Sequence, residues 1–157
     1  MIAAFAQQLR AAHEPIVQRW MAAVRADPKL TTANRLAEKE LRDHLGSLVL
    51  RLAETLAASA AEPLDEEPEV TPGTEKDARK HGQTRWAQHY RVDELVREIS
   101  VLRYEMIEIF REFIKGRGKL ETEEFLQTTQ VVHRFFDEIC MDSVAVYVNE
   151  REEQAAI

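Results

Sequence analysis

The sequence has very little cysteine, and it has no long hydrophobic run. Cys140 is the single cysteine of the 157 residues, so no intramolecular disulfide can form, and we expect a reducing, cytoplasmic location. No apolar run approaches the roughly 18 residues that a membrane span needs, and no basic leader precedes an apolar segment. The sequence therefore predicts neither a membrane-inserted protein nor a secretory signal.

The motifs that usually accompany catalysis or metal binding are also missing. The five glycines form no phosphate-binding loop, no His-Glu-x-x-His motif occurs, and no second cysteine is present to hold zinc. Ser143 has Asp142 beside it but no histidine nearby in the sequence, which gives a hydrolytic triad no support. We expect no enzymatic activity, no catalytic residues, no metal and no cofactor.

Positive charge is the minority, and the excess of acid is concentrated in one segment. The net charge is −7, and residues 61–77 carry seven acidic residues and one lysine, a net charge of −6. Three of the five prolines lie in the same segment. We predict an exposed acidic loop over 61–77 within a single domain spanning 1–157. The acidic balance and the absence of a basic stripe argue against nucleic acid as a partner.

Apolar residues recur every three or four positions along most of the chain, which predicts helices and no sheet. Residues 2–26 form either two short helices or one helix kinked at Pro15. A second helix is predicted to begin at Thr31 or Thr32, whose hydroxyls are suitable caps, and to continue through Leu56.

Three further helices are predicted in the second half of the chain. One extends from about 75 to 90 and is broken or kinked by Gly82, and the next, over 93–115, has a heptad pattern. The last can be capped by Thr122 and is apolar over more than half of its circumference. Together these patterns predict an elongated, antiparallel, all-α bundle of about five helices. The apolar surfaces of the last two helices exceed one inward stripe, so we expect a homodimer.

Three of the five histidines are candidates for a binding site. His44 falls among the leucines of the second helix, where a hydrogen-bonded core histidine is the simpler interpretation. His81 and His89 flank Arg85 at equal spacing, so this row is a candidate for binding an anion or, through neutral imidazoles, heme or a metal. The simpler interpretation is a polar cluster in which His81 and Arg85 meet Glu98 or Glu94 of the next helix.

One stretch of the chain resembles a known family. The residues that carry the resemblance are His81-Gly82-Gln83-Thr84-Arg85, Gln88, Tyr90, Glu94-Leu95-Val96-Arg97-Glu98 and Leu102-Arg103. They resemble the N-terminal domain of RsbRD-type RsbT co-antagonists, a domain also found before the catalytic parts of bacterial sensor histidine kinases. The family commonly has Gly before the Tyr and Ser after it, where this chain has His89 and Arg91. Loss of that Ser removes the natural cap of the following helix.

The resemblance implies a cytoplasmic, dimeric, non-catalytic input domain that passes a signal to a C-terminal output module. Some related sensor domains have a globin-like helix arrangement without heme, so that topology is an alternative to a simple bundle. We expect the signal to travel through the last helix and the helical arrangement to be biased by a polar cluster of His81, Arg85, Tyr90, Glu98 and Arg103. Two other functions remain open: a globin-like heme or tetrapyrrole sensor with His44, His81 or His89 as axial ligand, and a purely structural dimerisation or partner-docking domain.

Overall fold

The fold is a bundle of helices, as the sequence predicts. A computed structural model describes residues 1–62, 69–118 and 121–156, and these residues contain no strand. The helices in chain order are α1 (Ile2–Ala11), α2 (His13–Ala26), the 3₁₀ helix η1 (Ala33–Arg35), α3 (Glu38–Arg42), α4 (Leu45–Ser59), α5 (Thr74–Ala87), α6 (Val92–Lys115) and α7 (Thr122–Ala156). The prediction of an all-α fold is confirmed.

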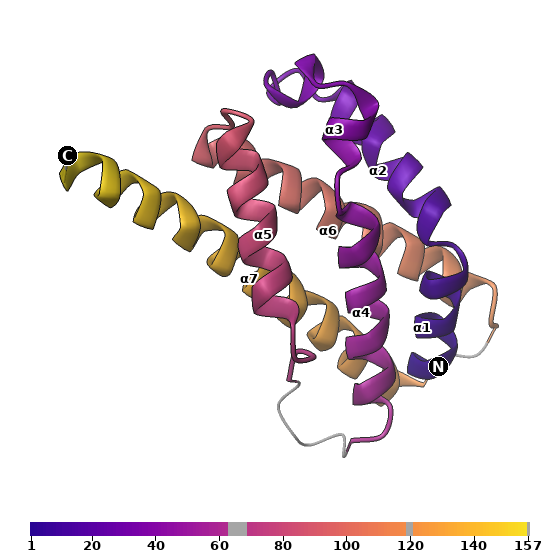
Figure 1. Ribbon diagram of the computed structural model, residues 1–157. Helices are drawn as coiled ribbons and strands as arrows, with labels where there is room; N and C mark the ends of the chain where they lie inside the picture. Colours follow the sequence, from indigo (N-terminus) through magenta and orange to yellow (C-terminus); the bar gives the residue numbers. More distant parts are fainter. Residues whose placement is uncertain (63–68, 119–120, 157) are drawn as a thin grey trace.

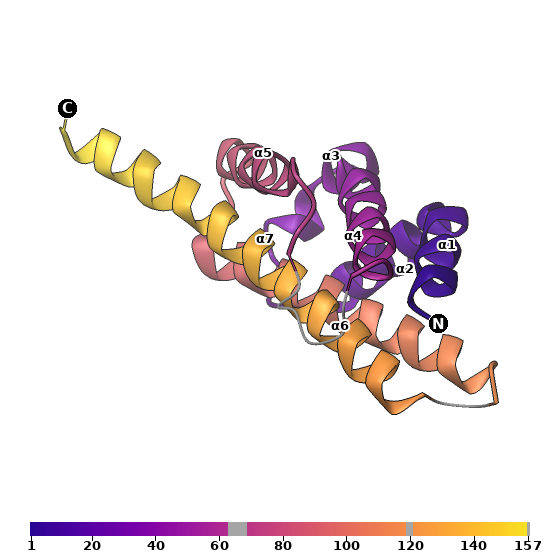
Figure 2. The ribbon, with the colours of Figure 1, turned by 90° about the horizontal axis from the view of Figure 1, so that it is seen from below.

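The two longest helices form a hairpin on which the other helices rest. Figures 1 and 2 show α6 and α7 side by side and antiparallel, with α1, α4 and α5 in a second layer that crosses them. The core between these layers is built on aromatic and branched side chains. Its largest fully buried apolar members are Trp20, Phe5, Phe135 and Phe136.

Pro15 separates α1 from α2, which settles the first of the open alternatives in favour of two helices. In a continuous helix the Pro15 nitrogen would have to donate to the Ala11 carbonyl, and proline has no N–H. The chain instead leaves helical geometry at Ala12 and resumes at His13, with Pro15 in the first turn, where its missing donor does no harm.

The single helix predicted from Thr31 or Thr32 to Leu56 is wrong, because tertiary contacts divide this segment into η1, α3 and α4. The Thr31 hydroxyl does not cap a helix but donates to the Glu94 carboxylate of α6, at 2.8 Å. At the end of α3 the carbonyls of Glu40 and Leu41 accept hydrogen bonds from Arg85 of α5. Asp43 then takes a positive φ of 35°, which no helix tolerates, before α4 begins.

Of the break or kink predicted at Gly82, the break is wrong, since α5 continues through this residue. Gly82 serves instead as the point where α5 and α7 approach closely. A Cβ atom at Gly82 would lie only 2.6 Å from the carbonyl oxygen of Ser143 on α7. Beside this contact, the Ser143 hydroxyl donates to the Ala78 carbonyl of α5, at 2.9 Å.

The acidic loop is shorter than predicted. Residues 74–77, assigned above to the loop over 61–77, form the first turn of α5, and Asp77 makes an ion pair with Arg51 at 2.8 Å. Acidic side chains are favourable there because they face the positive end of the helix dipole. Residues 63–68 of the predicted loop lie outside the described residues.

Replacing Gly82 by alanine should destabilise the protein, by about 2–3 kcal/mol, because its methyl group must push α5 away from the backbone of α7. The matched control is Gly46→Ala on α4, where the nearest atom to a Cβ is 3.9 Å away. That change should raise the free energy of unfolding by about 0.5 kcal/mol. Urea titration of both variants measures the two effects, and equal effects would contradict the close approach.

Candidate functional site around Glu98

A buried carboxylate on α6 collects the polar side chains of its neighbours. Glu98 is 1% exposed. Its Oε1 atom accepts a hydrogen bond from Arg85 Nε at 2.8 Å and lies 2.9 Å from His81 Nε2, while its Oε2 atom accepts from the Tyr90 hydroxyl at 2.6 Å. Four of the five residues predicted to form a polar cluster therefore meet at one carboxylate. We call this set, His81, Arg85, Tyr90 and Glu98, the Glu98 network.

Arg85 extends the Glu98 network to α3 and to the end of α5. Its Nη2 atom donates to the Leu41 carbonyl at 2.6 Å, and its Nη1 atom donates to Gln88 Oε1 at 2.7 Å and to the Glu40 carbonyl at 3.2 Å. The guanidinium also lies over the Tyr90 ring, 4.9 Å from its centroid. Arg85 is thus a fully buried cation that donates to backbone carbonyls in the last turn of the short helix α3.

Two aromatic side chains connect the network to the remaining helices through backbone carbonyls. The Trp20 indole of α2 donates to the Glu98 carbonyl at 3.3 Å, and the Tyr147 hydroxyl of α7 donates to the Tyr90 carbonyl at 3.0 Å. As a result, α2, α3, α5, α6 and α7 all contact one connected set of hydrogen bonds.

The electrostatics of the network favour an ion pair. Burial raises the pKa of Glu98, but the charge of Arg85 and the hydrogen bonds from His81 and Tyr90 outweigh it, so its pKa lies below the ordinary value. Burial and the neighbouring carboxylate both raise the pKa of Tyr90, whose hydroxyl therefore remains a donor. Glu98 is ionised and Arg85 compensates its charge, which is the condition under which a buried carboxylate is tolerated.

His44 lies beside the network rather than in it. Its ring meets that of His81 edge to face, with 5.1 Å between the centroids, and its Nδ1 atom pairs with Asp43. Burial and the neighbouring His81 lower the pKa of His44. Its Nε2 atom is buried and has no hydrogen-bond partner in the part of the chain that the structure describes.

Two of the three candidate histidines lie together at the network. His81 directs Nε2 to Glu98, and the His44 ring packs against the His81 ring. His89 is exposed beyond the end of α5 and lies apart from His81 and Arg85, so the predicted row of three basic residues does not form. Within the described ranges, no group of three or more His, Cys, Asp or Glu side chains is placed to hold a metal ion.

Arg103 does not belong to the network, contrary to expectation. It lies further along α6, where it donates to Asp137 of α7 at 2.8 Å and its guanidinium lies over the Phe136 ring. Five residues separate it from Glu98, which places the two on different faces of the helix.

The two positions at which this chain departs from the family pattern lie in the turn between α5 and α6. His89 has a φ of 65°, a left-handed conformation in which glycine is unstrained, so the glycine common in the family suits this position. Arg91 precedes α6 without a capping hydroxyl, and its N–H donates instead to the Glu94 carboxylate at 3.3 Å. Glu94 thus reaches back from the first turn to satisfy the Arg91 N–H, which is the reciprocal half of a capping box.

Trp20, Tyr147 and the carbonyls at the end of α3 belong to the site, yet sequence reasoning did not place them there. Trp20 and Tyr147 read as ordinary members of apolar stripes, since a stripe does not show where an indole N–H or a phenol hydroxyl ends. Backbone carbonyls leave no sequence signal at all. The one available indication was that each aromatic donor needs a partner once it is buried.

Replacing Glu98 by glutamine should lower the free energy of unfolding by about 3–5 kcal/mol, because it leaves Arg85 buried without a counter-charge. The control is Asp137→Asn, which breaks the exposed ion pair with Arg103 and should cost less than about 0.5 kcal/mol. Chemical denaturation monitored by circular dichroism compares the two. Similar losses for both variants would show that the Glu98 network does not hold the helices together.

Comparison with protein families places this geometry in a known context. The family model described as the RsbT co-antagonist protein rsbRD N-terminal domain matches residues 14–157. Comparisons with curated proteins and with solved structures find no match. The match includes every residue of the Glu98 network and all of the helices from α3 to α7. The chain belongs to the family of RsbRD N-terminal domains, and it is a regulatory domain of stress-response signalling.

Proposed function

We propose that this chain is the input domain of a bacterial signalling protein and that α7 transmits its signal to an output module such as a histidine kinase. The family description, which concerns the N-terminal domain of a co-antagonist protein, supports a role upstream of other modules. In this proposal the chain senses or integrates a stimulus and performs no catalysis itself.

The shape of α7 is the observation that carries the proposal. This helix has 35 residues, about 50 Å at 1.5 Å per residue, and its buried residues end at Tyr147. The C-terminal end of the helix projects away from the body, as Figure 2 shows, and residues 151–156 are exposed. A rigid element that is packed in the body over most of its length and free at one end is suited to carry a displacement outward.

The contacts of α7 with the body supply the coupling. Tyr147 connects it to the Glu98 network through the Tyr90 carbonyl, and the Gly82–Ser143 approach locks it against α5. Because both contacts are close and specific, α7 can move relative to α5 only by exchanging one packed arrangement for another. A stimulus that favours one arrangement would rotate or shift the free end of α7.

Insertions in the free part of α7 test this mechanism. One residue inserted between Arg151 and Glu152 rotates everything beyond it by about 100°, whereas seven residues return it to nearly the original phase. In the signalling protein that carries this chain, the first insertion should abolish or lock the output, measured as kinase autophosphorylation, and the second should largely preserve its regulation. Equal outputs for both insertions, with unchanged circular dichroism, would reject transmission through α7.

Dimerisation through α6 and α7 is a second role that the surface favours. Apolar side chains remain exposed on both helices, namely Val92, Val96 and Tyr104 on α6 and Leu126, Met141 and Val148 on α7. Tyr104 is 64% exposed and Met141 is 56% exposed, and both would be covered in a dimer formed through these two helices.

Sedimentation at micromolar concentration should therefore show a dimer, and Tyr104→Asp should convert it to a monomer without loss of helix content. Gln83→Asp on α5 adds the same charge away from these surfaces and should leave the dimer intact. A monomeric parent protein would reject this role.

A further inference from the structure

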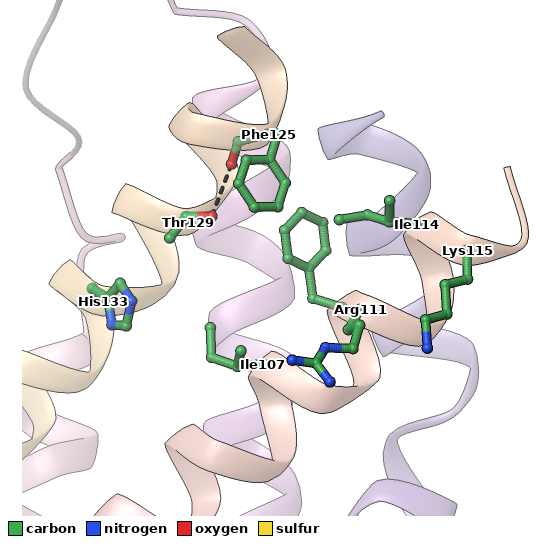
Figure 3. Close-up of a pocket in the computed structure, with 8 residues that line it drawn as sticks. Ile107, Arg111, Ile114, Lys115, Phe125, Thr129 and His133 are labelled. Atoms are coloured by element: carbon green, nitrogen blue, oxygen red, sulfur yellow. Dashed lines mark hydrogen bonds between the residues drawn. The ribbon is translucent and has the colours of Figure 1, made fainter. Parts of the chain in front are cut away.

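A pocket of about 360 Å³ lies between the C-terminal half of α6 and the N-terminal part of α7 (Figure 3). Its volume is within the range of small-molecule sites in proteins. It is separate from the Glu98 network, which lies near the other end of α6. The residues that line it are Ile107, Phe110, Arg111, Ile114, Lys115, Phe125, Thr129 and His133.

The inner wall of this pocket is apolar and partly aromatic. The rings of Phe110 and Phe125 are nearly parallel, with 17° between their planes and 5.8 Å between their centroids. Ile107 and Ile114 lie on either side along α6, and Figure 3 shows both between the two helices. Such a wall favours a flat apolar body.

The rim of the pocket has the opposite charge to the rest of the chain. Arg111 and Lys115 supply its positive charge, His133 lies beside them, and no acidic residue lines the pocket, although acidic residues outnumber basic ones in the sequence. The hydroxyl of Thr129, the remaining polar group, donates to the Phe125 carbonyl at 2.9 Å. The Thr129 hydroxyl is the only side-chain oxygen among the residues that line the pocket.

The cations of the rim are only weakly paired with acidic side chains. Arg111 Nη1 lies 3.8 Å from Glu108 Oε1, which is a long ion pair. By comparison, Arg103 meets Asp137 at 2.8 Å and Arg19 meets Glu105 at 2.6 Å. Lys115 makes no ion pair within residues 1–62, 69–118 and 121–156. An apolar wall beneath incompletely paired cations is suited to a molecule with an apolar body and an anionic head.

We propose that this pocket binds a small planar carboxylate, with its ring system against Phe110 and Phe125 and its carboxylate between Arg111 and Lys115. This inference rests on the proposed function, since it names the chemical class of the input. A ligand in this position contacts both α6 and α7, so it stabilises the hairpin arrangement in which the pocket is open. Because α7 also contacts the Glu98 network through Tyr147, stabilising the hairpin also affects the position of α7 in the body.

Binding of 2-naphthoate to the 157-residue chain, measured by calorimetry, tests the proposal, with neutral 2-naphthamide as the matched ligand. We expect 2-naphthoate to bind with a dissociation constant of about 1 mM or tighter, and 2-naphthamide about 10-fold more weakly. Raising the salt concentration should weaken the binding of 2-naphthoate but not that of 2-naphthamide. Equal affinity for the two compounds, or no binding of 2-naphthoate, would overturn the proposal.

Variants locate the site. Arg111→Gln and Lys115→Gln should each weaken 2-naphthoate binding about 3-fold, and together about 10-fold, without affecting 2-naphthamide. Arg117→Gln removes a nearby charge that does not line the pocket and should have no effect. Ile107→Phe should fill the pocket and abolish binding of both compounds while circular dichroism stays unchanged. Binding that survives Ile107→Phe lies elsewhere and overturns the assignment.

Two further outcomes separate this proposal from its alternatives. If a second copy of the chain occupied the groove, affinity for 2-naphthoate would fall as protein concentration rises, which would also overturn the assignment. Failure of binding leaves the insertion experiment on α7 untouched, because that experiment measures output and needs no ligand. Conversely, binding requires no output module, so loss of α7 transmission would not affect it.

Discussion

The need to neutralise one buried carboxylate organises most of this structure. Glu98 has no access to water, so its charge must be met by donors from the protein, and these come from α5 and from the turn that follows it. Arg85 also brings N–H groups into the interior that do not bond to Glu98, and the carbonyls at the end of α3 accept hydrogen bonds from them. Because these donors and acceptors must meet, the burial of this charge fixes the positions of α3, α5 and α6 relative to one another.

The same constraint supports the signalling role proposed above. Hydrogen bonds within a low-dielectric interior are strong when complete and costly when one partner is lost, so the network favours discrete arrangements over gradual ones. Tyr147 connects α7 to this network at the point where the helix leaves the body. The α6–α7 hairpin also carries the pocket near Phe110 and Phe125, at its other end. The α6–α7 hairpin therefore connects the candidate input pocket, the Glu98 network and the projecting end of α7.

Prediction from sequence succeeded where a local rule decides the outcome. The heptad pattern over 93–115 predicts α6, which begins one residue earlier, and α7 begins at Thr122 itself, one residue before a cap at Thr122 would start it. Prediction failed where a residue distant in the sequence contacts a group to which a local rule assigns another role. Thr31 is a good cap by composition, but its hydroxyl bonds to Glu94 instead. Gly82 resembles a helix breaker, but its small size is needed by the backbone of α7. Arg103 is predicted to join the polar cluster, but its position on α6 directs it to Asp137 and Phe136 of α7 instead.

The sequence by itself determined the helical class, the approximate extent of the long helices, and the pairing of basic residues of α5 with an acidic residue of α6. These follow from hydrophobic periodicity and from the rule that buried charges are paired, both of which act within short distances along the chain. Only the tertiary structure decided that Glu98 is the shared acceptor, that Trp20 and Tyr147 reach the network, and that α7 approaches α5 at Gly82. Those outcomes depend on which surfaces meet across the bundle, and the pattern along a single helix carries no information about its neighbour.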